Sequence, residues 1–143
     1  MADNPEQGPT TGLTPHLTIR DRKGLEAVAF YKRALAATEA MQPLMADDGE
    51  RIMHAHLIVN GASLMLADDW PEMRGGTASP PPAAVTLHLQ VDDADAWFDR
   101  AVEAGATDGM PPQDMFWGDR YGQFTDPFGH TWAVGARIEG EAK

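Results

Sequence analysis

The chain has 143 residues, a normal length for a single domain, and a chain this long buries roughly two-thirds of its unfolded surface. It carries 22 acidic and 11 basic residues, and the resulting net charge of −11 argues against nucleic-acid binding, because phosphates would be repelled. It has no cysteine, which excludes disulfides, thiolate metal sites and a cysteine nucleophile and fits a reducing compartment.

The beginning of the chain lacks the charged-then-apolar pattern of a signal peptide, and no apolar run approaches the roughly 18 residues of a membrane span. We therefore expect residues 1–12 to form a short disordered lead, and we expect no membrane partner. The cytoplasm is the default location.

The first half of the chain shows apolar patterns in the order strand, helix, strand, strand, strand. In the first strand, His16 and Thr18 share one face and Leu17 and Ile19 share the other, as period-2 alternation requires. Asn60-Gly61 is the signature of a type I′ turn between the last two strands. The predicted strands are 13–21, 38–45, 51–59 and 62–67, and the predicted helix is 25–35.

Residues 69–84 are rich in proline and glycine and have no hydrophobic period, which predicts a linker. The strand and helix patterns then restart. Asp93 is the expected N-cap of the second helix, and Gly105 is expected to end it. A type I turn at 126–129 joins the last two strands. The predicted strands are 85–91, 107–110, 121–125 and 131–134, and the predicted helix is 94–104.

The restart indicates an internal repeat. The sequence HLTI at residues 16–19 matches HLQV at 88–91, and the aromatic pair of the first helix, Phe30-Tyr31, matches Trp97-Phe98. We therefore predict two βαβββ modules, 13–68 and 85–137, joined by the 69–84 linker and followed by a tail, 138–143. Chance similarity between two strand–helix units is the alternative interpretation.

The sequence WGDRYG at 117–122, followed by DPFGHTW at 126–132, resembles the PhnB-like branch of the vicinal oxygen chelate superfamily. This is the glyoxalase, bleomycin-resistance and dioxygenase group. The resemblance extends from about Leu13 to Arg137. It implies an α+β fold in which the two modules form an open, cup-like mixed β-barrel with helices outside and a ligand cavity on the concave face.

The resemblance also implies positions for metal ligands, because metal-using members take one ligand from the first and one from the last strand of each module. These positions fall on His16, Met65, Thr86 and Ala133. Only His16 suits a metal, since a thioether is a poor ligand for hard divalent ions and about three protein ligands are needed. We therefore predict no metal and no cofactor.

The other histidines leave alternatives open. A divalent-metal site at other than the inherited positions could use His16 and His88, or the His54-x-His56 pair. However, no strand carboxylate lies beside these histidines in the sequence. The main interpretation is that the histidines line the pocket or form hydrogen bonds in the core. Some of them can also act as a general acid or base, because imidazole titrates near neutrality. The roles of His54, His56 and His130 stay open.

Two residues of the WGDRYG sequence have competing interpretations. Arg120 can anchor a carboxylate or phosphate, or it can pair with Asp119 or Asp126 as a structural brace. Trp117 can stack on a flat ligand or pack between modules or subunits. The predicted ligand-binding residues are His16, His56, Thr86, His88, Trp117 and Arg120.

The sequence favours a metal-independent protein that binds a small organic molecule and sequesters or modifies it, and the acidic surface favours a cationic guest. The alternative is a divalent-metal-dependent lyase, isomerase or dioxygenase that uses a non-inherited histidine site. A third possibility is a subunit with a role only in assembly. No S-adenosylmethionine-binding pattern is present, which argues against a methyltransferase. The resemblance implies a homodimer, with modules paired within one chain or exchanged between two.

Overall fold

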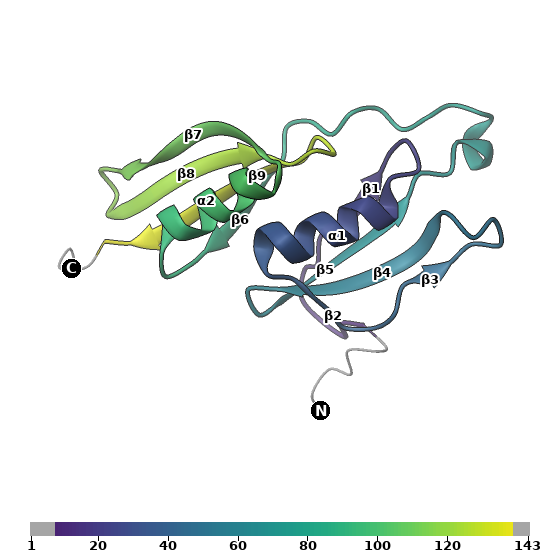
Figure 1. Ribbon diagram of the computed structural model, residues 1–143, viewed down its shortest axis with the longest axis horizontal. Helices are drawn as coiled ribbons and strands as arrows, with labels where there is room; N and C mark the ends of the chain where they lie inside the picture. Colours follow the sequence, from purple (N-terminus) through teal and green to yellow (C-terminus); the bar gives the residue numbers. More distant parts are fainter. Residues whose placement is uncertain (1–7, 139–143) are drawn as a thin grey trace. The chain divides into compact units, whose positions relative to one another are not determined.

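The computed structural model describes residues 8–138, and Figure 1 shows its helices and strands. Residues 1–7 of the predicted lead and residues 139–143 of the predicted tail lie outside the described residues. The chain divides into two compact units, with the boundary between Pro81 and Pro82 and with residues 33–35 grouped with the second unit. Within the described residues, no helix is long and apolar enough to cross a membrane.

The first unit consists of one helix and a mixed sheet, with an additional short 3-10 helix after the last strand. Its elements are β1 (His16–Ile19), α1 (Gly24–Leu35), β2 (Thr38–Glu39), β3 (Leu44–Met45), β4 (Ile52–Val59), β5 (Ala62–Asp68) and η1 (Pro71–Arg74). The strand order is β1-β5-β4-β2, and β3 also pairs with β4. β1 runs parallel to β5, whereas β4 is antiparallel to it.

The second unit repeats this topology. Its elements are β6 (Thr86–Gln90), α2 (Ala94–Ala104), β7 (Thr107–Asp114), β8 (Asp119–Thr125) and β9 (Thr131–Arg137). The strand order is β6-β9-β8-β7, with β6 parallel to β9 and the other pairs antiparallel. In both units the first strand therefore pairs with the last. The expected α+β fold with two βαβββ modules is confirmed.

Each sheet buries one face under its helix, as Figure 1 shows for α1 and α2. In the first sheet, the register places Leu17 beside Leu66, and Leu66 beside Ala55, so that all three lie on one buried face. α1 contributes Phe30 and Tyr31, whose rings contact each other edge to face with centroids 5.5 Å apart. The hydrophobic alternation in the sequence therefore becomes a continuous core on one side of the sheet.

The local signals in the sequence produce the expected turns and caps. Asn60 and Gly61 have φ values of 50° and 80°, as a type I′ turn requires. The Asp93 carboxylate accepts a hydrogen bond from Ala96 N at 3.0 Å and caps α2, which ends at Gly105. Gly129 N donates to Asp126 O at 3.1 Å, which closes the turn between β8 and β9.

The structure corrects two expectations. The predicted strand over 38–45 is two short strands, β2 and β3, because residues between them do not continue the ladder with β4. The predicted short strand at 107–110 extends to Asp114, with two register shifts along β7. Such bulges accommodate Pro111 and Pro112, which have no N–H to donate to a regular ladder.

Candidate functional site

Two predicted ligand-binding residues and one implied metal-ligand position lie in one row on the first sheet. They lie on the face opposite α1, which we name the first polar face. His16 on β1 is the register partner of Met65 on β5, and Met65 is in turn the partner of His56 on β4. The rings of His16 and His54 stack with centroids 6.3 Å apart. The alternation of β1 thus places His16 opposite the core, as expected from the sequence.

The histidines of the first polar face differ in their surroundings. His56 is only 2% exposed, and its Nε2 lies 2.8 Å from Ser63 Oγ in a hydrogen bond. Burial lowers the pKa of His54, and the nearby His16 and His56 lower it further. The neutral form of His54 is therefore favoured, while His16 is the exposed imidazole of the group.

The donor set of the first polar face does not fit a divalent metal ion. Met65 lies between His16 and His56 and offers a thioether, which is a poor ligand for hard cations. Among residues 8–138, no three His, Asp or Glu side chains form a group that could hold a metal ion. The chemistry of this face is therefore that of imidazole, hydroxyl and thioether groups.

A second group of polar side chains lies on the face of the second sheet opposite α2, which we name the second polar face. The register pairs His88 with Ala133, whereas Thr86 pairs with Thr131. The pair that corresponds to His16 and Met65 in the first sheet is thus His88 and Ala133 by register. Thr86, the position that the resemblance implied for a ligand on this strand, lies two residues before His88 on the same face.

His88 lies directly above the backbone of Gly135. A Cβ atom at residue 135 would lie 2.9 Å from His88 Cε1 and 3.2 Å from Gln90 Oε1. His88 Nε2 forms a hydrogen bond of 2.8 Å with Gln90 Oε1. With Nε2–H as the donor to this oxygen, Nδ1 is the ring atom that can accept a hydrogen bond. Glycine at 135 thus allows the imidazole to approach the sheet closely.

Aromatic rings continue from His88 to the β7–β8 connection. The rings of His88 and Tyr121 stack with centroids 5.9 Å apart and an interplanar angle of 14°. Trp117 contacts Tyr121 edge to face at 5.7 Å, and Phe116 contacts Trp117 in the same way at 5.0 Å. Trp117 is 51% exposed and Phe116 is 96% exposed. We name His88, Tyr121 and Trp117 the aromatic cluster.

Polar groups surround the aromatic cluster. Gln123 Nε2 donates to Tyr121 Oη at 2.9 Å, and Gln90 Nε2 lies 3.5 Å from Asp119 Oδ2. Asp119 also accepts a hydrogen bond from Arg137 Nε at 2.9 Å. The cluster therefore combines a half-exposed indole, an imidazole stacked on a phenol ring, and a nearby carboxylate, which suits recognition of a flat, polar organic molecule.

Arg120 is a structural brace, but its partners are not those expected from the sequence. Its Nε donates to Asp95 on α2 at 2.7 Å, and its Nη1 donates to Asp114 on β7 at 3.0 Å. These two carboxylates raise the pKa of the guanidinium, Asp95 more than Asp114. The predicted partners Asp119 and Asp126 are wrong, because β8 directs Asp119 to Arg137 and Asp126 to the following turn.

Asp126 organises the turn that the DPFG sequence predicted. One carboxylate oxygen accepts from Phe128 N at 2.9 Å and His130 N at 3.0 Å. The other oxygen accepts from the indole Nε1 of Trp132 at 2.9 Å. Both Asp126 and Trp132 are buried. The motif therefore fixes the start of β9, the strand that pairs with β6 beneath His88.

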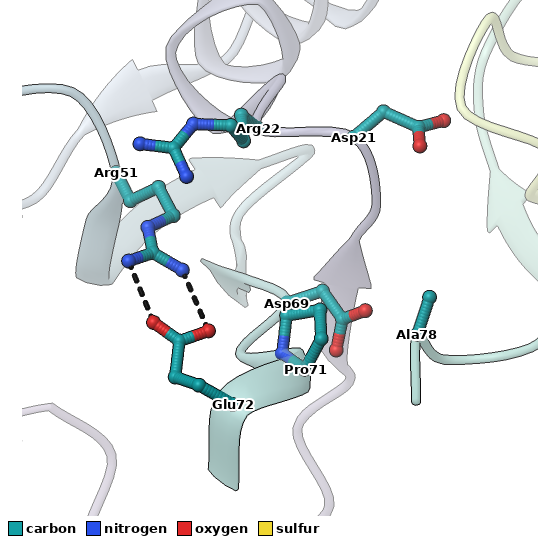
Figure 2. Close-up of a pocket in the computed structure, with 7 residues that line it drawn as sticks. All are labelled: Asp21, Arg22, Arg51, Asp69, Pro71, Glu72 and Ala78. Atoms are coloured by element: carbon teal, nitrogen blue, oxygen red, sulfur yellow. Dashed lines mark hydrogen bonds and ion pairs between the residues drawn. The ribbon is translucent and has the colours of Figure 1, made fainter. Parts of the chain in front are cut away.

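The sequence did not reveal a pocket in the first unit, which we name the loop pocket (Figure 2). Its volume is about 210 Å³, and it lies where the segment after β5 folds back over the start of β4. Charged residues from three segments line it, together with Pro71 and Ala78. The charged residues are Asp21, Arg22, Arg51, Asp69 and Glu72.

Arg51 contacts two carboxylates and one aromatic ring at the loop pocket. Its Nη1 and Nη2 donate to the two carboxylate oxygens of Glu72 at 3.1 and 2.8 Å, as Figure 2 shows. Its Nε donates to Asp48 at 2.8 Å, and its guanidinium lies 3.9 Å from the centre of the Trp70 ring. Glu72 and then Asp48 raise the pKa of Arg51, and Arg51 lowers the pKa of both carboxyls.

Asp69 anchors the segment that closes the loop pocket. Burial alone would raise its pKa, but hydrogen bonds from Ser79 N and from the guanidinium of Arg74 lower the pKa to about 2. The carboxylate accepts from Ser79 N and from Ser79 Oγ, both at 2.8 Å. The proline-rich segment predicted as a linker therefore begins with an ordered loop. No local sequence pattern pairs Asp69 with Ser79, which lies ten residues later in the chain.

Comparison with known proteins gives a family match, relatives in sequence and relatives in structure. The sequence profile of the Glyoxalase/Bleomycin resistance protein/Dioxygenase superfamily matches residues 14–134. An uncharacterized protein of Mycobacterium bovis is 44% identical over 130 residues, which are 88% of this chain and 83% of the relative. The crystal structure of protein PA1353 from Pseudomonas aeruginosa matches this chain with a TM-score of 0.69 and 28% sequence identity. The match covers 90% of this chain and 98% of that chain.

A third comparison concerns the fold alone. The fosfomycin resistance protein FosX from Listeria monocytogenes is 16% identical, with a TM-score of 0.65, and the match covers 92% of this chain and 97% of that chain. At this level of identity the likeness extends to the arrangement of helices and strands. The residues of the two polar faces must therefore be interpreted from this chain's own geometry.

Proposed function

The chain belongs to the glyoxalase/bleomycin resistance protein/dioxygenase superfamily, and from this premise we propose that it binds a small organic molecule at the aromatic cluster. The proposed function is sequestration or modification of that molecule without a divalent metal ion. The observation that carries the proposal is the stack of His88 on Tyr121, beside the exposed Trp117 and above Gly135.

The geometry of the aromatic cluster supports a flat ligand. Stacking of Tyr121 on His88 and the edge contact with Trp117 hold the rings in fixed positions, so that little side-chain freedom is lost when a ligand binds. Asp119 and the net charge of −11 favour a ligand that is cationic or neutral. His88 Nδ1 is the group we propose to accept a hydrogen bond from the ligand.

The other predicted ligand-binding residues fall into two groups. Thr86 is exposed on the second polar face, and we propose it as a contact of the ligand at the aromatic cluster. His16 is exposed on the first polar face, and we propose it as a ligand contact of that face by itself. His56 is buried against Ser63, and Arg120 bridges two carboxylates. We therefore assign His56 and Arg120 supporting roles.

Titration with two planar probes of opposite charge tests the proposal. In NMR spectra, 1-methylquinolinium should shift the indole N–H of Trp117 and the backbone of β6, and 2-naphthoate should bind more weakly. Trp117→Ala and His88→Ala should each weaken 1-methylquinolinium binding by about 10-fold, the loss expected for a central aromatic contact. Met73→Ala is the control, because Met73 is 79% exposed in the first unit. Unchanged binding in both cluster variants would refute the proposal.

Metal analysis tests the alternative, a metal-dependent enzyme that uses histidines of the first polar face. The stacked His16 and His54 are the observation in favour of that alternative, and Met65 is the observation against it. Metal analysis of protein purified without chelators should show no stoichiometric divalent ion. An ion present at one per chain, and lost in His16→Ala, would instead support a metal-dependent lyase, isomerase or dioxygenase.

We further propose that the chain is a member of the PhnB-like branch and a cytoplasmic homodimer. The support for the branch is the sequence WGDRYG followed by DPFGHTW. The support for the dimer is the superfamily's tendency to dimerise, and whether modules pair within one chain or are exchanged is a separate question. Light scattering coupled to size-exclusion chromatography should give twice the 15.5 kDa mass of the chain, and a monomer at all concentrations would contradict the dimer.

A further inference from the structure

We propose that the loop pocket is a binding site for a small organic carboxylate, which takes the place of Glu72 in the fork of Arg51. In the structure, the Glu72 carboxylate binds the two Arg51 nitrogens that the ligand carboxylate would use. The pocket lies in the first unit, so this proposal does not depend on the ligand proposed for the aromatic cluster.

Arg51 presents a preformed carboxylate-binding fork. Its side chain is only 11% exposed, and Asp48 and the Trp70 ring hold the guanidinium on two sides. The two remaining nitrogens point at the pocket and bind the Glu72 carboxylate in the bidentate geometry that arginine offers to any carboxylate. A ligand carboxylate can use the same two donors without a change in Arg51.

Glu72 is released easily from this fork. It belongs to η1, which has four residues, none of them buried, and its own side chain is 54% exposed. The pair is bidentate, but Glu72 is the exposed partner, so water solvates its carboxylate when it leaves the fork. Exchange of one carboxylate for another is therefore opposed only weakly.

The pocket keeps its shape when Glu72 leaves. The segment that closes it is anchored by Asp69, through Ser79 and Arg74, and by the contact of Trp70 with Arg51. Neither anchor involves Glu72. The volume of about 210 Å³ accommodates a benzoate-sized molecule, and Pro71 and Ala78 offer apolar wall to its ring.

The arrangement of charges orients the ligand. Figure 2 shows Arg22 and Arg51 on one side of the loop pocket and the carboxylates of Asp21 and Asp69 on the other. A carboxylate that faces the two arginines avoids the acidic side, whereas a cation in the same place would meet the Arg51 guanidinium. Arg22 already pairs with Asp48 and Glu50, so Arg51 supplies the direct contact.

Benzoate and benzamidine, which have the same ring and opposite charges, test the site. Benzoate should shift the NMR signals of Arg51 Nε–H and Trp70, and Glu72→Gln should bind it about 3- to 10-fold more tightly, because the competing carboxylate is gone. Arg51→Lys should lose most of the affinity. Glu26→Gln is the matched control, since Glu26 is an exposed glutamate on α1 that does not line the loop pocket.

Three results would overturn the proposal. They are equal affinity in Glu72→Gln and the unsubstituted protein, tighter binding of benzamidine than of benzoate, and benzoate shifts confined to the aromatic cluster. Glu72 is exposed, so Glu72→Gln should fold normally, and this variant keeps the test decisive even if Arg51→Lys does not fold. Loss of 1-methylquinolinium binding in Trp117→Ala, by contrast, reports only on the aromatic cluster.

Discussion

The carboxylate of Asp68 occupies the space in which a side chain at Gly24 would lie. A Cβ atom at residue 24 would be 2.8 Å from Asp68 Cγ, and the backbone N–H of Gly24 donates to Asp68 Oδ1 at 2.9 Å. The other oxygen of Asp68 accepts from Ile52 N at 2.6 Å. One buried carboxylate at the end of β5 thus connects the start of α1 with the start of β4.

Gly24→Ala should therefore destabilise the protein by about 2 kcal/mol, the usual cost of forcing an extra group into a packed site. The methyl group must displace Asp68, which also weakens the hydrogen bonds to Gly24 and Ile52. Urea unfolding followed by circular dichroism measures the change. Ala29→Ser, at an exposed position of the same helix, is the control and should change stability by much less. Equal stability of Gly24→Ala and the unsubstituted protein would show that Asp68 moves freely.

The anchor of the loop pocket should depend on pH. The pKa of Asp69 is about 2 in the folded protein and near 3.8 when unperturbed. Since the folded pKa is the lower one, the stabilisation is complete above about pH 4 and is lost as the pH falls through about 2. The difference in unfolding free energy between the unsubstituted protein and Asp69→Asn should therefore be constant from pH 7 to 5 and decrease at pH 3. Asp47→Asn, which removes an exposed carboxylate, controls for overall charge.

Gly135→Ala tests whether the close approach of His88 to the sheet positions the aromatic cluster. The new methyl group would lie 2.9 Å from His88 Cε1, so the ring must move away from Gly135. We expect the ring-current shift that Tyr121 imposes on the His88 Cε1–H signal to change, with a stability loss of about 1 kcal/mol. In the His88→Ala background the same glycine substitution should cost less, because Gln90 Oε1 at 3.2 Å then remains as the close contact. A similar cost in both backgrounds would mean that His88 is not the group displaced.

Trp132 and Asp126 should be energetically coupled. Asp126→Ala removes the acceptor of the buried Trp132 Nε1–H and of two backbone N–H groups, so we expect a loss of about 3 kcal/mol. Trp132→Phe removes only the indole donor and should cost less. Unfolding measurements on both single variants and the double variant give the coupling energy, which we expect to be about 1 kcal/mol. Strict additivity would contradict a direct role for the indole hydrogen bond.

The local patterns of the sequence were sufficient for the elements of the fold. Alternation placed Leu17 and Ile19 in the core, Asp93 capped the second helix, and Asn60-Gly61 formed the hairpin turn. The resemblance to the superfamily, whose most specific motifs are the sequences at 117–122 and 126–132, is confirmed by the profile match over 14–134. Each of these signals depends on residues close together in the chain, where backbone geometry fixes the outcome.

Long-range partners could not be deduced in the same way. Arg120 was expected to pair with a neighbour in sequence, yet it bonds Asp95, 25 residues away. Its partner depends on the packing of α2 against β8, which a sequence pattern does not specify. The same holds for the strand over 38–45, whose division into β2 and β3 follows from how each segment meets β4.

The sequence by itself determined a duplicated βαβββ chain with histidines on the polar sides of its first strands, because side-chain periodicity and turn chemistry act over a few residues. Only the tertiary structure decided which other side chains each of these histidines contacts. Strand register placed His88 above Gly135 and Met65 between His16 and His56. The segment after β5 brings Glu72 to Arg51, which directly precedes β4. This contact spans 21 residues and forms only when β4 and β5 are paired.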